Sequence, residues 1–256
     1  MRFLMLALLA IASVAHAADK DDVHEFFDNL VERTNAFDAG VANLYSPDAR
    51  IIAVVDGGDI VEISGSQLKQ IANQVMPIAK KRGDTNTYKK VKVSPHGEGF
   101  RVTGVRFSAA KCVTDPNYHL DVVRHDKSWL VIEEYGETVS LSQCKTSKKL
   151  AASLNALRDG IVPHLPLDLD ADTRLEAVEV VGPALIYRQR LHTIAAAETD
   201  MQKLVPALRQ IGYQNACGLQ QIKTLINEGA TVRYQYIDRN GAKLANVDFA
   251  PGFCPS

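Results

Sequence analysis

The sequence predicts an α+β protein with two domains, and three observations lead to this fold class. Apolar residues recur at helical spacing early in the first half of the chain and in the middle of the second, and runs of alternating or β-branched residues follow the first helices and flank the second. A stretch rich in proline and aspartate lies between the halves and is typical of a linker. We therefore expect a curved antiparallel sheet wrapped on helices, followed by a smaller ββααββ domain.

Residues 1–17 have the pattern of a secretory signal peptide. Arg2 precedes an apolar run over residues 3–14, and a small-x-small tripeptide at 15–17 predicts cleavage after Ala17. The run of about a dozen residues is shorter than the roughly 20 that span a membrane, and no later stretch approaches that length. No cysteine follows the cleavage site to carry a lipid. We expect a soluble bacterial protein that is periplasmic or secreted.

The charge of the chain is close to neutral. Removing Arg2 with the signal segment leaves 28 basic against 30 acidic residues, a formal charge of −2. This balance gives no reason to expect nucleic acid or an anionic membrane as a partner. The basic groups at 80–83 and 88–92 are typical of a solvated helix end and strand edge, and their functional alternative is an acidic protein partner.

The first domain is expected over residues 18–144. Ser66 is predicted to be the N-cap of its long helix, and Gly83 the residue that ends that helix. Pro77 is expected to bend or shorten it. The apolar pattern predicts helices at 23–37, 39–44 and 67–82, and strands at 49–55, 59–64, 88–95, 99–112, 117–126 and 128–141.

A helical and acidic linker is expected over residues 145–172, and the second domain over 173–256. Pro206 predicts that the first helix of this domain begins near Leu204. The Asn240-Gly241 pair predicts a tight hairpin turn. The predicted order is strands at 174–181 and 184–191, helices at 204–213 and 216–229, and strands at 230–237 and 242–249.

Four cysteines in an exported chain predict two disulfides. Their spacing favours Cys112 with Cys144 and Cys217 with Cys254, because each pair then lies within one domain. The second bridge pins the end of the chain to the second helix of its domain. A zinc or redox site is the alternative, but the sequence has no C-x-x-C motif and no histidine at ligand spacing from a cysteine.

Residues 22 to about 138 resemble the nuclear transport factor 2-like superfamily. The resemblance rests on "FFDNLVERTNAFDAGVANLYSPDARI", on "ISGSQLKQIA" and on "HDKSWLVIEE". It implies a cone-like cavity between a bent sheet and its helices, which some members use for catalysis and others for binding. The C-terminal part is similar to small secreted bacterial domains of unassigned function, through "GATVRYQYIDRNG" and the terminal cysteine.

Ketosteroid isomerase, a member of this superfamily, works through an aspartate base and an oxyanion hole of a tyrosine and a protonated acid. No motif places that set on this chain, and the residue types alone make Tyr45, Asp56 and Tyr135 candidates. The strand "YHLDVVRHD" adds His119 and Asp121 on one face as an acid–base pair, with a solvent-facing strand as the alternative. The resemblance itself therefore indicates a fold and no reaction.

An acidic segment, "DLDADTRLEAVE", is the most specific polar pattern. Its carboxylates fall at positions 1, 3, 5, 9 and 12 of a calcium loop, although Thr173 stands where such loops require glycine. The alternative is a solvated linker without a cofactor. The candidate ligands are Asp168, Asp170, Asp172, Glu176 and Glu179.

Three functions remain open on the sequence alone. The lack of an assembled catalytic set favours a non-catalytic binding protein for a small apolar ligand or a protein partner. A small-molecule isomerase or hydrolase that uses the N-terminal cavity is the first alternative. A secretion-associated or toxin-neutralising interaction protein is the second. A homodimer through the N-terminal sheet fits any of these.

Overall fold

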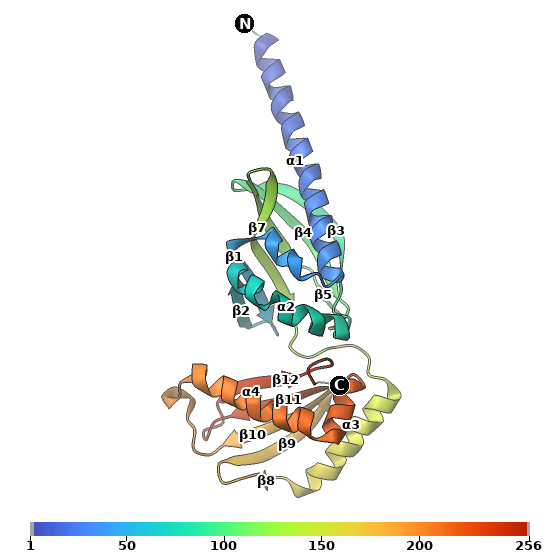
Figure 1. Cartoon of the computed structure of the whole chain (residues 1–256), viewed down its shortest axis with the longest axis vertical. Helices are drawn as coiled ribbons and strands as arrows, with labels where there is room; N and C mark the ends of the chain where they lie inside the picture. Colours follow the sequence, from blue (N-terminus) through green and yellow to red (C-terminus); the bar gives the residue numbers. More distant parts are fainter. Residues whose placement is uncertain (1–2, 255–256) are drawn as a thin grey trace. The chain divides into compact units, whose positions relative to one another are not determined.

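The computed structural model describes the backbone of residues 3–254 and the side chains of residues 19–254. The chain divides into two compact units, Met1–Ser140 and Leu141–Ser256, and each has its own hydrophobic core (Figure 1). The backbone of the expected signal segment continues the first helix from Phe3 onward, and its side chains lie outside the described residues. No helix within the described residues is long and apolar enough to cross a membrane.

The N-terminal unit is an α+β domain of the expected kind. Its helices are α1 (Phe3–Asn35), the 3-10 helix η1 (Ala39–Leu44) and α2 (Gly65–Arg82). Its strands are β1 (Tyr45–Val55), β2 (Asp59–Ser64), β3 (Asn86–His96), β4 (Gly99–Ser108), β5 (Val113–Asp115), β6 (His119–His125) and β7 (Ser128–Thr138). The helices and strands therefore follow the order that the sequence predicts, with the short strand β5 in addition.

The sheet of this unit has seven strands within the described residues, in the order β2-β1-β7-β6-β4-β3, with β5 paired to β4. Its neighbours are antiparallel except for β1 and β7, which run parallel from Arg50 beside Glu133 to Val55 beside Thr138. The wholly antiparallel sheet expected from the sequence is therefore wrong at this pair. β1 and β7 are more than 70 residues apart in the chain and are not joined by a hairpin, so they can pair in parallel.

The core of the unit lies between the sheet and its helices. α1 packs on β3 and β4 while α2 packs on β1 and η1, as Figure 1 shows. Val23, Phe27 and Leu30 project from one stripe of α1 and are at most 2 % exposed. They meet inward residues of the strands, including Val102, Leu120, Val122 and Val131. The helical spacing in the sequence thus identified the buried face correctly.

The start of α2 differs from the expectation by two residues. Ser64, not Ser66, is the N-cap, because its hydroxyl accepts a hydrogen bond from the Gln67 backbone N–H at 3.1 Å. The Gln67 side chain in turn accepts from the Ser64 N–H at 2.8 Å, which completes a capping box. Ser66 instead donates to the Pro47 carbonyl at 3.0 Å. Pro77 lies within the helix, which continues to Arg82 and ends at Gly83 as predicted.

The C-terminal unit contains α3 (Lys148–Ile161), η2 (Val162–His164), η3 (Ala196–Glu198), α4 (Met201–Gly218) and α5 (Gln220–Asn227). Its strands are β8 (Leu167–Asp168), β9 (Thr173–Val181), β10 (Ala184–Leu191), β11 (Thr231–Ile237) and β12 (Lys243–Phe249). They form one sheet in the order β12-β11-β10-β9-β8. β10 and β11 run parallel because α4 and α5 form the crossover between them, and the other neighbours are antiparallel.

The expected linker over residues 145–172 is wrong. α3 belongs to the core of the C-terminal unit, where Leu154 is fully buried and Leu150 is 5 % exposed. The leucines recur at helical spacing, and such a stripe gains stability by packing on a sheet. η2 and β8 follow α3 at once, and β8 adds the edge strand beside β9. The ββααββ prediction therefore lacks an initial helix and an edge strand.

The start of α4 also differs from the prediction. It begins at Met201, where the Asp200 side chain accepts from the Gln202 N–H at 3.0 Å, and it contains Pro206. The cap satisfies one of the free N–H groups of the first turn, so the helix starts ahead of the proline. α4 continues to Gly218, which places Cys217 on the first helix of the pair and not on the second.

Candidate functional site

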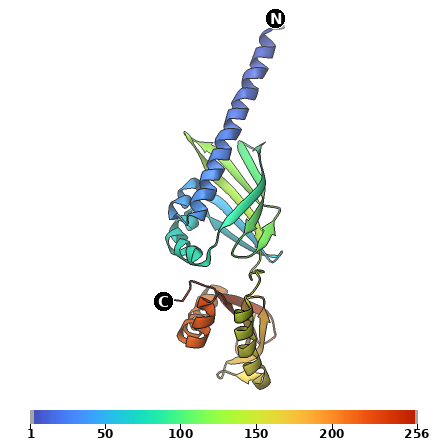
Figure 2. The same cartoon turned by 90° about the vertical axis from the view of Figure 1, so that its right-hand side faces the viewer.

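The candidate site is an apolar groove in the C-terminal unit. α3 packs on β9 and β10, α4 packs on β12, and α5 contacts β11 and both of the other helices. The two long helices cover the same face of the sheet, as Figure 2 shows with α3 in olive and α4 in orange. A cavity of about 810 Å³ lies between them over the middle strands. Ligand pockets of proteins fall in this range of size.

The groove is lined by residues from every element around it. The walls come from Leu157 and Ile161 of α3 and from Leu208 and Ile211 of α4. The remaining lining residues are Leu167, Leu169, Asp170, Thr173, Leu175, Tyr187, Gln189, Leu191, Asn215, Leu219, Gln220, Gln221, Ile222, Tyr234 and Tyr236. Most of these side chains are aliphatic or aromatic. The groove therefore offers mainly dispersion contacts and desolvation to whatever enters it.

Three tyrosines form the floor of the groove. The rings of Tyr187 and Tyr234 stack at a centroid distance of 5.5 Å, and those of Tyr234 and Tyr236 at 6.5 Å. Each is at most 9 % exposed. Burial raises the pKa of Tyr187 and Tyr236 to about 12, and it raises the pKa of Tyr234 as well. All three hydroxyls are therefore protonated and neutral at physiological pH.

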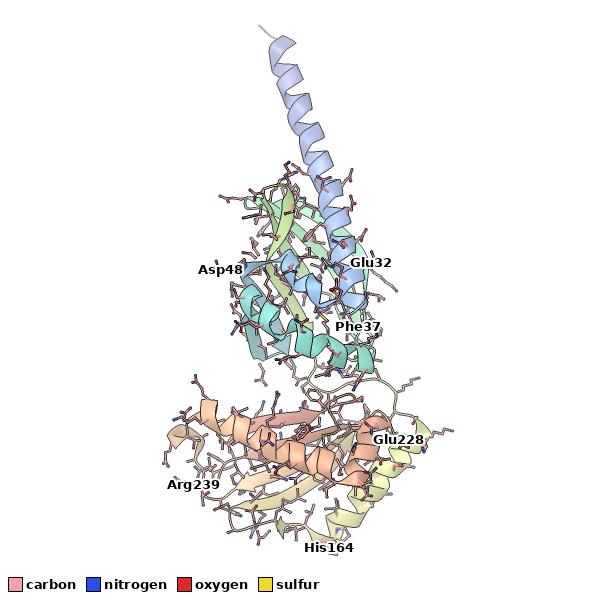
Figure 3. All side chains as sticks on the ribbon, in the orientation of Figure 1. Glu32, Phe37, Asp48, His164, Glu228 and Arg239 are labelled. Atoms are coloured by element: carbon pink, nitrogen blue, oxygen red, sulfur yellow. A yellow bond between two sulfur atoms is a disulfide. The ribbon has the colours of Figure 1, made fainter. Side chains whose placement is uncertain are left out.

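The close approach of α4 to the sheet fixes one wall of the groove. A Cβ atom at Gly212 would lie 2.9 Å from Cε2 of Phe249, so this position of α4 has room only for glycine against β12. At the far side, α3 is held at its start by Lys149, whose Nζ donates to Glu228 at 2.6 Å. Figure 3 labels Glu228 there and His164 just beyond the other end of α3.

Apolar side chains also surround the mouth of the groove. Leu167 and Leu169 are 42 % and 46 % exposed, and Ile211 and Leu219 are 50 % and 58 % exposed. All four line the groove. Exposed leucines that gather around a cavity, in contrast to scattered ones, are characteristic of binding surfaces. Local sequence patterns do not identify this site, because its residues come from seven elements and only the parallel crossover brings them together.

The five candidate calcium ligands do not converge. Asp168 pairs with Arg174 at 2.6 Å, and this hydrogen bond lowers the pKa of the carboxyl group. Glu176 pairs with Arg190 and Glu179 with Arg188. Asp170 accepts hydrogen bonds from the N–H groups of Asp172 and Thr173, both at 2.8 Å. The segment from Thr173 is a strand, so alternate residues point to opposite faces. Among the described residues, no group of three or more metal-ligating side chains is present.

The interior of the N-terminal unit contains a second polar cluster. Tyr45 donates to Oε2 of Glu134 at 2.5 Å, and Tyr118 donates to Oε1 at 3.1 Å. The guanidinium of Arg106 lies 5.2 Å from the centre of the Tyr118 ring and bonds to Asp115 at 3.2 Å. Burial, followed by the charge of Glu134, raises the pKa of both tyrosines well above 10. Their hydroxyls are therefore permanent donors to the carboxylate.

His119, Asp121 and Tyr135 lie on the opposite face of that sheet. His119 stacks on Tyr135 at 5.0 Å, and its Nε2 is 3.5 Å from Oε1 of Glu133. Asp121 accepts two hydrogen bonds from Arg101, at 2.6 and 2.5 Å. His119 and Asp121 are thus paired with other residues and not with each other, so the structure does not assemble the expected acid–base pair.

Asp56 and Tyr135 have structural partners. Asp56 lies in the turn between β1 and β2 with φ of 53°, and its carboxylate accepts from the Ser140 N–H at 3.0 Å. Tyr135 donates to Glu137 at 3.1 Å, and burial raises its pKa, with that hydrogen bond as the second cause. Of the five candidates, only Tyr45 belongs to the hydrophobic core of this unit, although Asp121 is also buried at 7 % exposed. Sequence reasoning missed Glu134 and Tyr118, although their inward positions on β7 and beside β6 follow from strand alternation.

A smaller hollow of about 400 Å³ lies at one end of the N-terminal unit. Its lining includes Arg82, Arg106 and Lys111 together with Asp84. Phe37, labelled in Figure 3, lies at its edge with φ of 59°. Arg82 and Arg106 are paired with Asp84 and Asp115 respectively. Within this unit the polar side chains are thus largely committed to each other.

All four cysteines are disulfide-bonded. Cys217 of α4 and Cys254 are joined with Cα atoms 5.3 Å apart, as the spacing predicts. Cys254 is 4 % exposed and belongs to the core of the C-terminal unit. The bridge therefore ties the residues after β12 to the helix that forms one wall of the groove.

Comparison with known proteins finds no match to any family model and no match among curated proteins. Solved structures do match. A protein described as secreted from Pseudomonas aeruginosa has a TM-score of 0.38 and 18 % identity, and the match covers 43 % of this chain and 99 % of that one. A nuclear transport factor 2-like protein with a cystatin-like fold from Novosphingobium aromaticivorans has a TM-score of 0.38 and 13 % identity, over 52 % of this chain and 90 % of that one.

A third similar structure is the type 2 secretion system pilotin of Vibrio vulnificus, with a TM-score of 0.37 and 11 % identity, over 43 % of this chain and 94 % of that one. Nuclear transport factor 2-like proteins are thus among the similar structures. The α+β class that the sequence predicts is shown by the helices and strands of the chain itself. At these identities the similarity concerns the fold alone.

Proposed function

We propose that this chain is an extracytoplasmic binding protein whose C-terminal groove holds an apolar ligand. Two features support export. All four cysteines are disulfide-bonded, a state that persists in oxidising compartments. Residues 1–17 have the charged, apolar and small-residue regions of a signal peptide.

The observation that carries the binding proposal is the apolar groove itself. A cavity of about 810 Å³, walled by α3 and α4 and floored by three buried tyrosines, places a large apolar area in contact with water. Covering such an area contributes about 25 cal/mol for each Å² removed from water. A ligand that fills the groove gains this free energy without first opening the core.

The enzyme alternative draws its best support from the Tyr45–Glu134 pair, and the geometry favours a structural role there. A general acid or base needs a pKa near the working pH. The raised pKa values of Tyr45 and Tyr118 keep both hydroxyls protonated and donating to Glu134. We therefore place function in the C-terminal groove and not, as the sequence analysis suggested, in the N-terminal cavity.

A protein partner is the second candidate, and the apolar mouth of the groove favours it. The four exposed side chains Leu167, Leu169, Ile211 and Leu219 extend the apolar surface beyond the cavity. An amphipathic segment that lies along the groove would cover them in addition to the floor. A secretion-associated or toxin-neutralising role would use the site in this way.

Binding of the uncharged dye N-phenyl-1-naphthylamine to the full-length mature protein tests the first proposal. We expect its fluorescence to rise on binding, and Ile211→Glu to weaken binding at least about tenfold, because a charge on the wall must be desolvated. Val181→Glu is the matched control, since Val181 is 48 % exposed in the same unit but does not line the groove. No dye binding, or equal losses in both variants, would refute the proposal.

Native mass spectrometry of the protein from its own exported fraction separates the two candidates. A retained mass of a few hundred daltons supports the small ligand. A stoichiometric complex with another chain, weakened by Ile211→Glu and not by Val181→Glu, supports the protein partner.

A further inference from the structure

The floor of the groove contains polar atoms as well as apolar ones. Tyr236 lines the groove and is 2 % exposed, and its hydroxyl has no hydrogen-bond partner among the described residues. Gln189 of the neighbouring strand β10 lies opposite Tyr236 in the register of β10 and β11. It is 5 % exposed and lines the same groove. Tyr236 thus borders the cavity and has a buried hydroxyl without a partner.

A buried hydroxyl without a partner destabilises the folded chain, because it has given up its hydrogen bonds to water without replacing them. A ligand oxygen that reaches it recovers this loss, because the hydroxyl has already been removed from water. The floor therefore favours a ligand that has a hydrogen-bond acceptor at its buried end.

The charge of the lining sets a second condition on the ligand. Among the described residues that line the groove, Asp170 is the one charged residue, and lysine and arginine are absent from the lining. Asp170 is fixed at the mouth by the N–H groups of Asp172 and Thr173. A fatty acid anion in this groove would lose its hydration, meet no cation and approach a carboxylate. An uncharged head group avoids all three costs.

We propose that the groove binds an uncharged, lipid-like molecule with one hydrogen-bonding oxygen, such as a long-chain alcohol or ester, and that this oxygen accepts a hydrogen bond from Tyr236. The inference rests on the proposed binding function of the groove and adds the chemical class of the ligand. The apolar chain of the ligand lies between α3 and α4, and its oxygen lies on the sheet.

Competition with N-phenyl-1-naphthylamine tests this class on the full-length mature protein at pH 8. Dodecan-1-ol is expected to displace the dye at a concentration at least about tenfold lower than sodium dodecanoate, which corresponds to about 1.4 kcal/mol. Asp170→Asn keeps an acceptor for the two backbone N–H groups and removes the charge. It is expected to strengthen dodecanoate binding and to leave dodecanol binding within about twofold, because dodecanol has no charge to repel.

Tyr236→Phe tests the hydrogen bond. It is expected to weaken dodecanol about fivefold to tenfold, which is the contribution of one hydrogen bond, and to leave the affinity for the dye unchanged. Tyr213→Phe is the matched control, because Tyr213 belongs to the same unit and does not line the groove, and it is expected to change dodecanol binding less than about twofold. Thermal unfolding of Tyr236→Phe at or above the wild-type temperature shows that the site is intact, since the variant removes an unpartnered group.

The outcomes separate this inference from the function on which it rests. No dye binding by the wild-type protein overturns both. Dye binding with dodecanoate as effective as dodecanol, or with no change in Tyr236→Phe, overturns the ligand class and leaves the apolar groove as a binding site.

Discussion

Tyr45 and Tyr118 donate hydrogen bonds to the two oxygens of one carboxylate, Glu134, at 2.5 and 3.1 Å. The three residues come from the start of β1, the residue before β6 and the middle of β7. Both tyrosines are at most 5 % exposed. The carboxylate thus satisfies two hydroxyls that would otherwise be buried without acceptors, and it links β1 to the strand that runs parallel to it.

Glu134→Ala is expected to destabilise the N-terminal unit by about 2–4 kcal/mol, because it leaves both hydroxyls without their acceptor. Glu134→Gln retains one acceptor oxygen and should therefore lose less stability than Glu134→Ala. Urea unfolding followed by the fluorescence of the single tryptophan, Trp129, measures this, since Trp129 is 8 % exposed in the same core. Equal stability of Glu134→Ala and the wild type would mean that water replaces the carboxylate at no cost.

Much of the N-terminal unit could be predicted from local pattern. The stripe of Val23, Phe27 and Leu30 and the glycine stop at Gly83 follow from short-range spacing, which the structure retains. The contact of Tyr45 with Glu134 joins residues 89 apart in the chain, and the parallel pairing of β1 with β7 likewise joins distant residues. No local propensity encodes such a contact, so the interior cluster was not predicted.

The groove was beyond sequence reasoning for a related physical reason. Leu154 and its neighbours were interpreted as part of a linker because prolines and aspartates follow them, although burial on the sheet decides their role. Once α3 packs on β9, the space between α3 and α4 becomes a site. Alternation along β11 places Tyr234 and Tyr236 on one face, but the position of Tyr187 beside them follows only from the parallel register of β10 and β11.

Replacing both Cys217 and Cys254 with serine is expected to destabilise the C-terminal unit. The bridge closes a loop with a sequence separation of 37 residues, and loop-closure entropy for this length corresponds to about 4 kcal/mol. Hydrogen exchange followed by mass spectrometry on β11 and β12 measures the loss. The Trp129 transition is the internal control and should shift much less. Unchanged exchange in β12 would show that packing of Phe249 alone retains the end of the chain.

Stability of the C-terminal unit is expected to fall between pH 10 and 12. The pKa values of Tyr187 and Tyr236 rise from 10 to about 12 on folding, so the folded state holds their protons more tightly than the unfolded state. The stabilisation is complete below pH 10 and is lost as the pH rises toward 12, at about 3 kcal/mol for each tyrosine. Far-UV circular dichroism in urea at several pH values measures it. The double variant Tyr187→Phe/Tyr236→Phe should lose less stability over the same pH range. An equal loss in the variant and the wild type would show that other groups cause it.

Alanine at two glycines of the C-terminal unit should have opposite effects. In the interior of a helix, alanine is favoured over glycine by about 1 kcal/mol. At Gly160 of α3 nothing lies within 4 Å of an added Cβ, so Gly160→Ala is expected to stabilise the unit by up to that amount. At Gly212 the added Cβ would lie 2.9 Å from Phe249 and 3.3 Å from Tyr234.

Gly212→Ala therefore forces α4 away from β12 or moves the Phe249 ring, and overpacking of this kind costs about 1–3 kcal/mol. Because α4 is a wall of the groove, the same variant should also change the affinity for N-phenyl-1-naphthylamine, whereas Gly160→Ala should not. Differential scanning calorimetry and dye titration of both variants check this. A stabilised Gly212→Ala variant with wild-type dye binding would mean that α4 can shift on the sheet. The width of the groove would then be set by α5 and by the Lys149–Glu228 contact at the start of α3.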